Sequence, residues 1–261
     1  MITQKGIQVF SEALKTLVCL KKFNFYNQGK YSMIEGFSFI LDSLSYMKDL
    51  IDLRIVFSFE TIIFPVDAQI MVKSFKNLNQ LKYLELKGFN LFQLQQNDEI
   101  ADILANKILL ETLIIFFHRI PEDNLIYNKI SQNLQFLSNL KDLQLQVSDV
   151  SSRQIDLGFD FFSNSLIKLN NLECLNLQIQ SGNQVDLLQF SALGDALKTL
   201  IKLKQLDLFL GDSNRNALEK LTKLQNLNIE IETKAISYKH QYVHSSELEK
   251  ATNSTRCWQF F

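Results

Sequence analysis

The spacing of leucine residues changes along this chain in a way that recurs about every 30 residues. In the segment LKTLIKLKQLDLFL, leucines fall at every third position from Leu197 to Leu206 and then at every second position to Leu210. A spacing of three to four indicates a helix or helical turn, and a spacing of two indicates a strand with one buried face. Each recurrence therefore predicts a helix that leads through a short turn into a strand.

The position at which the spacing changes defines eight anchors, which stand 30, 31, 29, 30, 32, 31 and 21 residues apart. The anchors are Phe23, Leu53, Leu84, Leu113, Leu143, Leu175, Leu206 and Leu227. The residue three positions before each anchor is leucine in all eight cases. Across the anchors and the columns at −9, −6, −3 and +2, only Lys107 among 40 residues is not apolar, whereas a composition that is 46% hydrophobic would give about 18 apolar residues by chance. The chain is therefore built from repeats.

Each repeat predicts one α/β unit. Offsets −13, −10, −9 and −6 from an anchor share one face of a helix, and offsets 0, +2 and +4 share one face of a strand. A single unit buries only one side, so the units must stack, and parallel strands need helical crossovers of this length. The sequence therefore predicts about eight parallel strands covered by helices, which together form a solenoid over residues 1–232.

The repeated core LxxLxxLxL, present as LNQLKYLEL, LSNLKDLQL and LIKLKQLDL, resembles that of leucine-rich repeat proteins of the ribonuclease-inhibitor-like type. The resemblance runs from about Phe10 to Ile231. It implies a right-handed α/β solenoid, a horseshoe with strands on its concave face and helices on its convex face. The family usually carries Asn or Cys five residues after the anchor, whereas all eight units here carry other residues, among them Ser58, Phe89 and His118. This departure leaves the geometry of the turn after each strand open.

Residues 233–261 break the repeat pattern and form a separate tail. Two predictions stay open for this tail. Residues 236–243 could cover the sheet edge after Ile231, which would otherwise be exposed to unwanted pairing. Alternatively, the tail is disordered, as chain ends often are.

The composition excludes several classes of protein. A net charge of −1 argues against a dedicated nucleic-acid or acidic-membrane binder, which would carry a basic excess. The three cysteines, Cys19, Cys174 and Cys257, are far apart and odd in number, which indicates a reducing compartment rather than a disulfide framework. The longest apolar runs are much shorter than the roughly 18 residues of a membrane span. We expect a cytoplasmic protein with no nucleic-acid or membrane partner.

The sequence contains no pattern that specifies a reaction. Phosphate-binding glycine loops, the GxSxG nucleophile motif and kinase motifs are absent from the sequence. His240 and His244 stand four residues apart, but further zinc ligands at suitable spacing are missing. We therefore expect no enzyme, no cofactor and no metal site. Lys107, the one charge in an inward column, is expected to extend past the end of its helix toward solvent.

The side chains at offsets −1, +1 and +3 should point away from the helices and form the binding surface, because each strand contributes a few residues to a continuous face. In the first half of the chain these residues mix charges, aromatic rings and aliphatic groups, as an interface core does. The predicted partner-binding residues are Arg54, Tyr83, Glu85, Ile114, Phe116, Gln144 and Gln146. The alternative is a surface with no partner, or one covered by the tail.

The leading functional prediction is a non-catalytic scaffold that binds a protein partner on the concave sheet face. A second possibility is a regulator of a small GTPase, since some proteins with this repeat type supply an arginine to a partner's site. A third is a structural subunit of a larger assembly, such as a ciliary or cytoskeletal one. No residue pattern in the sequence identifies the partner.

Overall fold

The computed structural model describes residues 3–27, 36–62, 64–90, 102–118, 126–150, 159–181, 187–211 and 226–232. The strands form one parallel sheet in the order β1 to β8, and helices alternate with them along the chain. The helices are α1 (Gln4–Lys15), α2 (Phe37–Leu44), α3 (Pro65–Phe75), α5 (Ile126–Leu134), α6 (Phe159–Leu166) and α7 (Leu187–Thr199). The strands are β1 (Lys22–Asn27), β2 (Asp52–Ile62), β3 (Tyr83–Asn90), β4 (Thr112–His118), β5 (Asp142–Val150), β6 (Cys174–Ser181), β7 (Gln205–Gly211) and β8 (Asn226–Glu232).

The predicted anchors lie side by side across the sheet. Phe23 pairs in register with Leu53, Leu53 with Leu84, and Leu84 with Leu113. The same one-to-one pairing continues through the remaining anchors to Leu227 on β8. The prediction of a parallel α/β sheet with these residues on adjacent strands is confirmed.

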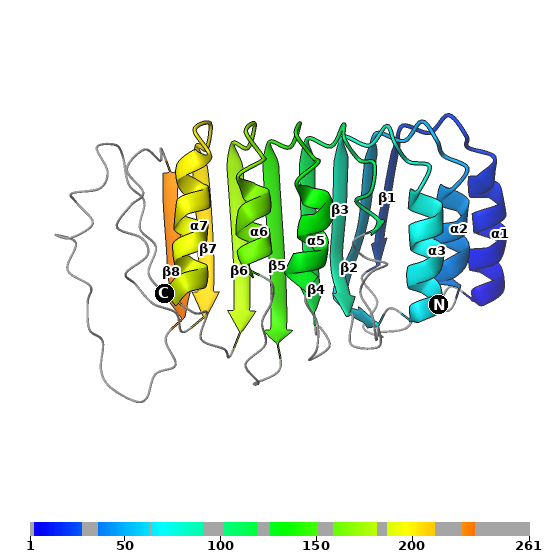
Figure 1. Ribbon diagram of the computed structural model, residues 1–261. Coiled ribbons are helices and arrows are strands. Elements are labelled where there is room, and N and C mark those ends of the chain that lie inside the picture. The colour runs from blue at the N-terminus through cyan, green and yellow to red at the C-terminus, as the bar shows by residue number, and fades with distance from the viewer. Residues whose placement is uncertain are drawn as a thin grey trace.

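The described helices all lie on one face of the sheet (Figure 1). The predicted inward helix face is buried in α2 and the turn after it, where Ile40, Ser43, Leu44 and Met47 are at most 1% exposed. A small residue such as Ser43 lets the helix pack closely, and its hydroxyl donates to the carbonyl oxygen of Ile40 at 2.6 Å. No buried hydroxyl is left unpaired at this position, so the serine is compatible with the core.

The first unit departs from the predicted pattern. In and after α1 the buried residues are Ile7, Ser11 and Leu14, whereas Phe10 is 50% exposed and Leu17 is 47% exposed. Both exposed residues were expected on the inward face. The helix α1 stands at one end of the row (Figure 1), and α2 is the neighbouring helix that packs against it. With a neighbour on one side, α1 buries a narrower stripe than the helices inside the row.

A repeated hydrogen-bond pattern joins each unit to the next at the start of its strand. The carbonyl oxygen of Lys21 accepts from the amides of Ile51 and Asp52 at 2.8 and 3.0 Å. The carbonyl oxygen two residues before an anchor accepts two successive amides of the next unit in the same way at Ile51, Lys82, Glu111, Lys141 and Glu173. The leucine at −3 lies in the turn before the strand: Leu50, for example, is buried, and its amide bonds the carbonyl oxygen of Met47 at 3.1 Å.

Asparagine side chains reinforce the stack at a position that the sequence analysis did not single out. Asn139 and Asn171, each four residues before an anchor, donate from Nδ2 to the carbonyl oxygens of Ile108 and Ser138 in the preceding unit, both at 2.8 Å. These bonds lie in the turn that enters the strand, and not in the turn that leaves it, where the resembling family places its asparagine. These two bonds link three consecutive units, those of Leu113, Leu143 and Leu175, through side chains as well as backbone.

A bulge in β3 changes the column at +4. Gly88 has a φ of +81°, a conformation that side chains other than glycine rarely adopt, and the register shifts between Lys87 and Phe89. Because of this shift, Phe89 pairs with Phe117 on β4 and is 1% exposed. The phenylalanine one position later thus fills the core place that the glycine leaves.

Candidate functional site

The face of the sheet opposite the helices is formed by three rows of side chains, at offsets −1, +1 and +3 from the anchors. We call this surface the open face. The first row runs through Asp52, Tyr83, Thr112, Asp142, Cys174 and Gln205. The second row runs through Arg54, Glu85, Ile114, Gln144, Asn176 and Asp207. The third row runs through Val56, Lys87, Phe116, Gln146 and Gln178.

Charged and aromatic side chains interlock on the part of the open face formed by β1 to β4. We call this group the N-terminal cluster; its members are Lys22, Asp52, Arg54, Tyr83, Glu85, Lys87 and Phe116. Arg54 donates from Nε and Nη2 to the two carboxylate oxygens of Asp52 at 3.0 and 3.3 Å. Its guanidinium carbon also lies 4.0 Å from the centre of the Tyr83 ring. The guanidinium group is therefore held by two contacts, the paired hydrogen bonds to Asp52 and the cation–π contact with Tyr83.

Glu85 is the second centre of this cluster. It accepts from the Tyr83 hydroxyl at 3.0 Å, and its other oxygen lies 2.7 Å from Nζ of Lys87. Nη1 of Arg54 lies 3.8 Å from the same carboxylate. The Lys87 ammonium in turn lies 4.5 Å from the centre of the Phe116 ring. The predicted residues Arg54, Tyr83, Glu85 and Phe116 are thus linked through Lys87, which the sequence analysis had placed on this face without selecting it.

Contacts within the N-terminal cluster and burial shift the pKa values of Asp52, Arg54 and Tyr83. Burial raises the pKa of Asp52, but the hydrogen bonds from Arg54 and Lys22 outweigh it and leave this pKa below its ordinary value. The hydrogen bond to Asp52 raises the pKa of Arg54. Burial, followed by the negative charge of Glu85, raises the pKa of Tyr83 to about 12. At neutral pH these shifts keep Asp52 and Arg54 charged and the Tyr83 hydroxyl protonated, so it can donate to Glu85.

One expectation about this surface was wrong. Ile114 was predicted as an exposed apolar group, but it is 6% exposed, and Glu85 beside it is 7% exposed. Ile114 lies on a central strand, flanked in register by Glu85 and Gln144, so neighbouring side chains cover it. Phe116 and Tyr83 are half-buried and stay partly accessible. The accessible apolar surface of the cluster therefore comes from aromatic rings rather than from Ile114.

The open face changes character from β5 onward. Gln144 lies beside Ile114 in the second row, and Gln146 lies beside Phe116 in the third row, so both predicted glutamines adjoin the cluster. The described side chains of the three rows on β5 to β7 are Asp142, Gln144, Gln146, Cys174, Asn176, Gln178, Gln205 and Asp207. They include two carboxylates and no cation, whereas β1 to β4 carry two carboxylates and three cations in the same rows.

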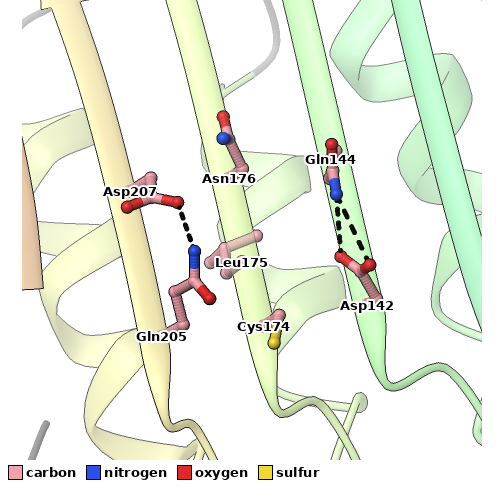
Figure 2. A pocket seen from close by; sticks show the side chains of 7 residues that line it. All are labelled: Asp142, Gln144, Cys174, Leu175, Asn176, Gln205 and Asp207. Carbon is pink, nitrogen blue, oxygen red and sulfur yellow. Dashed lines mark hydrogen bonds between the residues drawn. The ribbon is translucent and has the colours of Figure 1, made fainter. Parts of the chain in front are cut away.

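A pocket of about 110 Å³ lies in this second half, across β5, β6 and β7 (Figure 2). Gln144 donates to both oxygens of Asp142 at 3.4 Å, and Gln205 donates to Asp207 at 2.8 Å. Between these pairs, the Oδ1 atom of Asn176 is buried and has no hydrogen-bond partner. Asp142, Asn176 and Asp207 were not among the residues predicted from the sequence. The signal that could have found them is the presence of two carboxylates and no cation at the outward positions of three successive strands.

Lys107 is buried, contrary to the expectation that it would reach solvent. It is 1% exposed, and Nζ donates to the carbonyl oxygen of Ala105 at 3.1 Å. The preceding residue, Asn106, has a φ of 63°, so the chain turns sharply just before the lysine. Burial lowers the pKa of Lys107 to about 8. The side chain occupies the core place that is filled in other units by Met47, Leu78, Leu137, Leu169 and Leu200.

The described residues show no arrangement for metal chemistry, because no three His, Cys, Asp or Glu side chains among them are grouped to hold an ion. Cys19 and Cys174 are both free thiols. His240, His244, Cys257 and the proposed edge cap at 236–243 lie outside the described residues. Within the described helices, none has both the length and the apolar character to cross a bilayer. No protein-family model matches the chain, and none of the curated proteins compared with it is significantly similar.

Proposed function

We propose that this chain is a leucine-rich repeat solenoid that acts as a non-catalytic, cytoplasmic scaffold and binds a protein partner through its open face. The regular stacking of strand and helix in register supports the solenoid assignment. The two free cysteines support a reducing compartment. Under this proposal the open face is the concave surface of a horseshoe of about eight right-handed units.

The observation that carries the proposal is the N-terminal cluster. Arginine and tyrosine are the residue types that most often dominate binding energy at interfaces, and here Arg54 is stacked on Tyr83 at 4.0 Å. The contacts with Asp52 and Glu85 hold both side chains before any partner arrives. Side chains that are already ordered lose less conformational entropy on binding, which favours affinity. An accessible, pre-ordered group of this kind is suited to recognition.

The GTPase-regulator alternative receives no support from the described residues. Among the residues that the structure describes, Arg54 is the only arginine. Its guanidinium forms ion pairs with Asp52 and Glu85 and stacks on the Tyr83 ring. An arginine supplied to another protein's active site must be free to leave its own surface. The contacts of Arg54 therefore favour a binding role over a catalytic one.

The test uses the partner that co-purifies with the wild-type protein from native cells, identified by mass spectrometry and then purified. Its affinity is measured for wild-type protein, Phe116→Asp and Arg54→Ala. Loss of an interface hot spot typically costs about 2 kcal/mol or more, so we expect each variant to bind at least roughly tenfold more weakly.

Phe136→Asp is the matched control. Phe136 is 63% exposed in the turn that follows α5, away from the open face, and it undergoes the same chemical change as Phe116. We expect wild-type affinity for this variant. Equal binding by wild-type, Phe116→Asp and Arg54→Ala protein would refute the proposed binding surface, provided that circular dichroism shows all of them folded.

A further inference from the structure

The pocket across β5, β6 and β7 contains an acceptor atom that the folded chain leaves unused. Oδ1 of Asn176 is buried and makes no hydrogen bond. Leaving a buried acceptor unpaired costs about 1–3 kcal/mol, so native structures contain few such atoms. Asn176 is one of the residues that line the pocket on the open face, so its amide lies beside the pocket and not in the apolar core. A ligand that donates a hydrogen bond in this pocket would satisfy it.

Among the residues that the structure describes, no cationic group pairs with either carboxylate of the pocket, Asp142 or Asp207. Asp142 accepts long hydrogen bonds of 3.4 Å from Gln144, and Asp207 accepts one bond from Gln205, so both rely on neutral amides. Near the strand starts, Lys141 and Lys204 are engaged by Glu111 and Glu173 at 2.7 and 2.6 Å. In the N-terminal cluster, by contrast, Asp52 lies within 3.0 Å of two cationic groups.

The surroundings of the pocket strengthen its preference for a positive charge. Burial raises the pKa of Asp142, and burial together with the charge of Asp142 raises the pKa of the Cys174 thiol. A cation placed between the carboxylates would relieve this cost by supplying the missing opposite charge. An anionic ligand such as a phosphate group would be repelled by both aspartates.

We propose that this pocket binds the guanidinium group of an arginine side chain from the protein partner. The inference rests on the proposed function and adds the chemistry of the group that is recognised. The acceptors are Asp142, Asn176 and Asp207, which come from three adjacent strands and surround the pocket (Figure 2). A guanidinium has five N–H donors in one plane, whereas an ammonium is a compact group with three. The planar group can reach acceptors on several sides at once and is more easily stripped of water.

The experiment uses N-acetyl-arginine N-methylamide as a probe and follows the nuclear magnetic resonance signals of Asn176 in labelled full-length protein. We expect a saturable shift with a dissociation constant on the order of 1–10 mM, typical of a single side chain. N-acetyl-citrulline N-methylamide, a neutral analogue of nearly the same shape, should not saturate. Saturation by the citrulline probe at the same concentration would refute charge recognition.

The matched pair of variants tests the location. Asp142→Asn combined with Asp207→Asn should weaken the arginine probe at least tenfold. Glu12→Gln combined with Asp49→Asn changes the charge equally at exposed positions elsewhere and should leave binding unchanged. Both proteins are checked for folding by circular dichroism. Undiminished binding to the first double variant, or no binding to the wild-type protein, would overturn the proposal.

Two further outcomes are informative. If N-acetyl-lysine N-methylamide binds as tightly as the arginine probe, the assignment to arginine is wrong. If the arginine probe fails to bind while Phe116→Asp still loses the purified partner, the pocket inference is refuted and the proposed function stands. The two proposals can therefore fail separately.

Discussion

The α-carbon of Gly88 faces the backbone carbonyl of Phe57 so closely that a β-carbon at Gly88 would lie 2.3 Å from that oxygen. Phe57 is itself held in place, because its ring contacts those of Phe25, Phe37 and Phe89 at centroid distances of 6.0, 5.3 and 5.1 Å. The strand β2 cannot retreat without disturbing this aromatic group. The bulge at Gly88 and the packing of Phe57 therefore depend on each other.

Gly88→Ala should lower the free energy of unfolding by about 3 kcal/mol or more, because the clash with Phe57 adds to the strain of a positive φ. Urea unfolding followed by circular dichroism measures the change. The control is Gly6→Ala, at an exposed position in α1, where alanine should raise stability by up to about 1 kcal/mol. A Gly88→Ala protein as stable as wild type would show that the bulge is not required.

Lys107→Met should stabilise the protein at pH 7. The pKa of Lys107 is about 8 in the folded chain and 10.5 ordinarily, a difference that corresponds to roughly 3 kcal/mol against the folded state when the lysine is charged. Between these values the unfolded chain binds more protons, so wild-type stability should rise with pH from about 8 to 10.5. The stability advantage of the variant should be largest below pH 8 and should shrink above it.

Chemical unfolding of wild-type and Lys107→Met protein at a series of pH values measures this effect. Lys48→Met, at an exposed position, serves as the control and should show no such trend relative to wild type. A constant stability difference between Lys107→Met and wild type from pH 7 to 10.5 would mean that Lys107 is not buried as a strained charge.

Asp52→Asn should lower the free energy of unfolding at pH 7 by about 1–2 kcal/mol, since it removes charge-assisted bonds to Arg54 and Lys22. The folded pKa of Asp52 lies below its ordinary value of 3.8, so its contribution is complete above that value and is lost as the pH falls through the folded pKa. The difference in the free energy of unfolding between Asp52→Asn and wild-type protein should therefore disappear at acidic pH. The control is Asp49→Asn, which loses only an exposed ion pair with Lys21 and should change the free energy of unfolding by less than about 0.5 kcal/mol. An equal loss of stability in both variants would contradict this account.

Asn176→Val should raise the free energy of unfolding by about 1–2 kcal/mol, because it removes an unpaired buried acceptor and places a β-branched residue in a central strand. Thermal unfolding measures the gain, and the arginine probe should bind the stabilised variant at least tenfold more weakly. The control Asn24→Val changes an exposed residue of the same row on β1 and should have less than half of this effect. Destabilisation by Asn176→Val would show that the amide is already satisfied.

The strand register could be predicted from the sequence because it follows from the spacing of apolar residues. This spacing changes from three residues in the helix end and turn to two residues in the strand, and the change marks the same position in each unit. Leu53, Leu84 and Leu113 stand at the change of spacing in their units, and they pair side by side in the sheet. Local exceptions could not be predicted in the same way. Lys107 takes the buried place of its column despite its charge, and the exposure of Phe10 follows from the position of α1 at the end of the row.

The candidate site was predictable as a surface and not as a set of contacts. Alternation along each strand places Arg54, Tyr83 and Phe116 on the open face. Which carboxylate pairs with which cation depends on the rotamers of side chains on neighbouring strands. For this reason the link through Lys87 and the unpaired Oδ1 atom of Asn176 became visible only in three dimensions.

The shared carbonyl at the start of each strand, such as that of Lys21 bonded to Ile51 and Asp52, confines the stabilising bonds to adjacent units. A gene that gains or loses the codons of one whole unit would then change the span of the molecule by one strand spacing of about 4.8 Å while the packing inside the retained units stays the same. Evolution can in this way widen or narrow the footprint offered to a partner in discrete steps, without redesigning an interior.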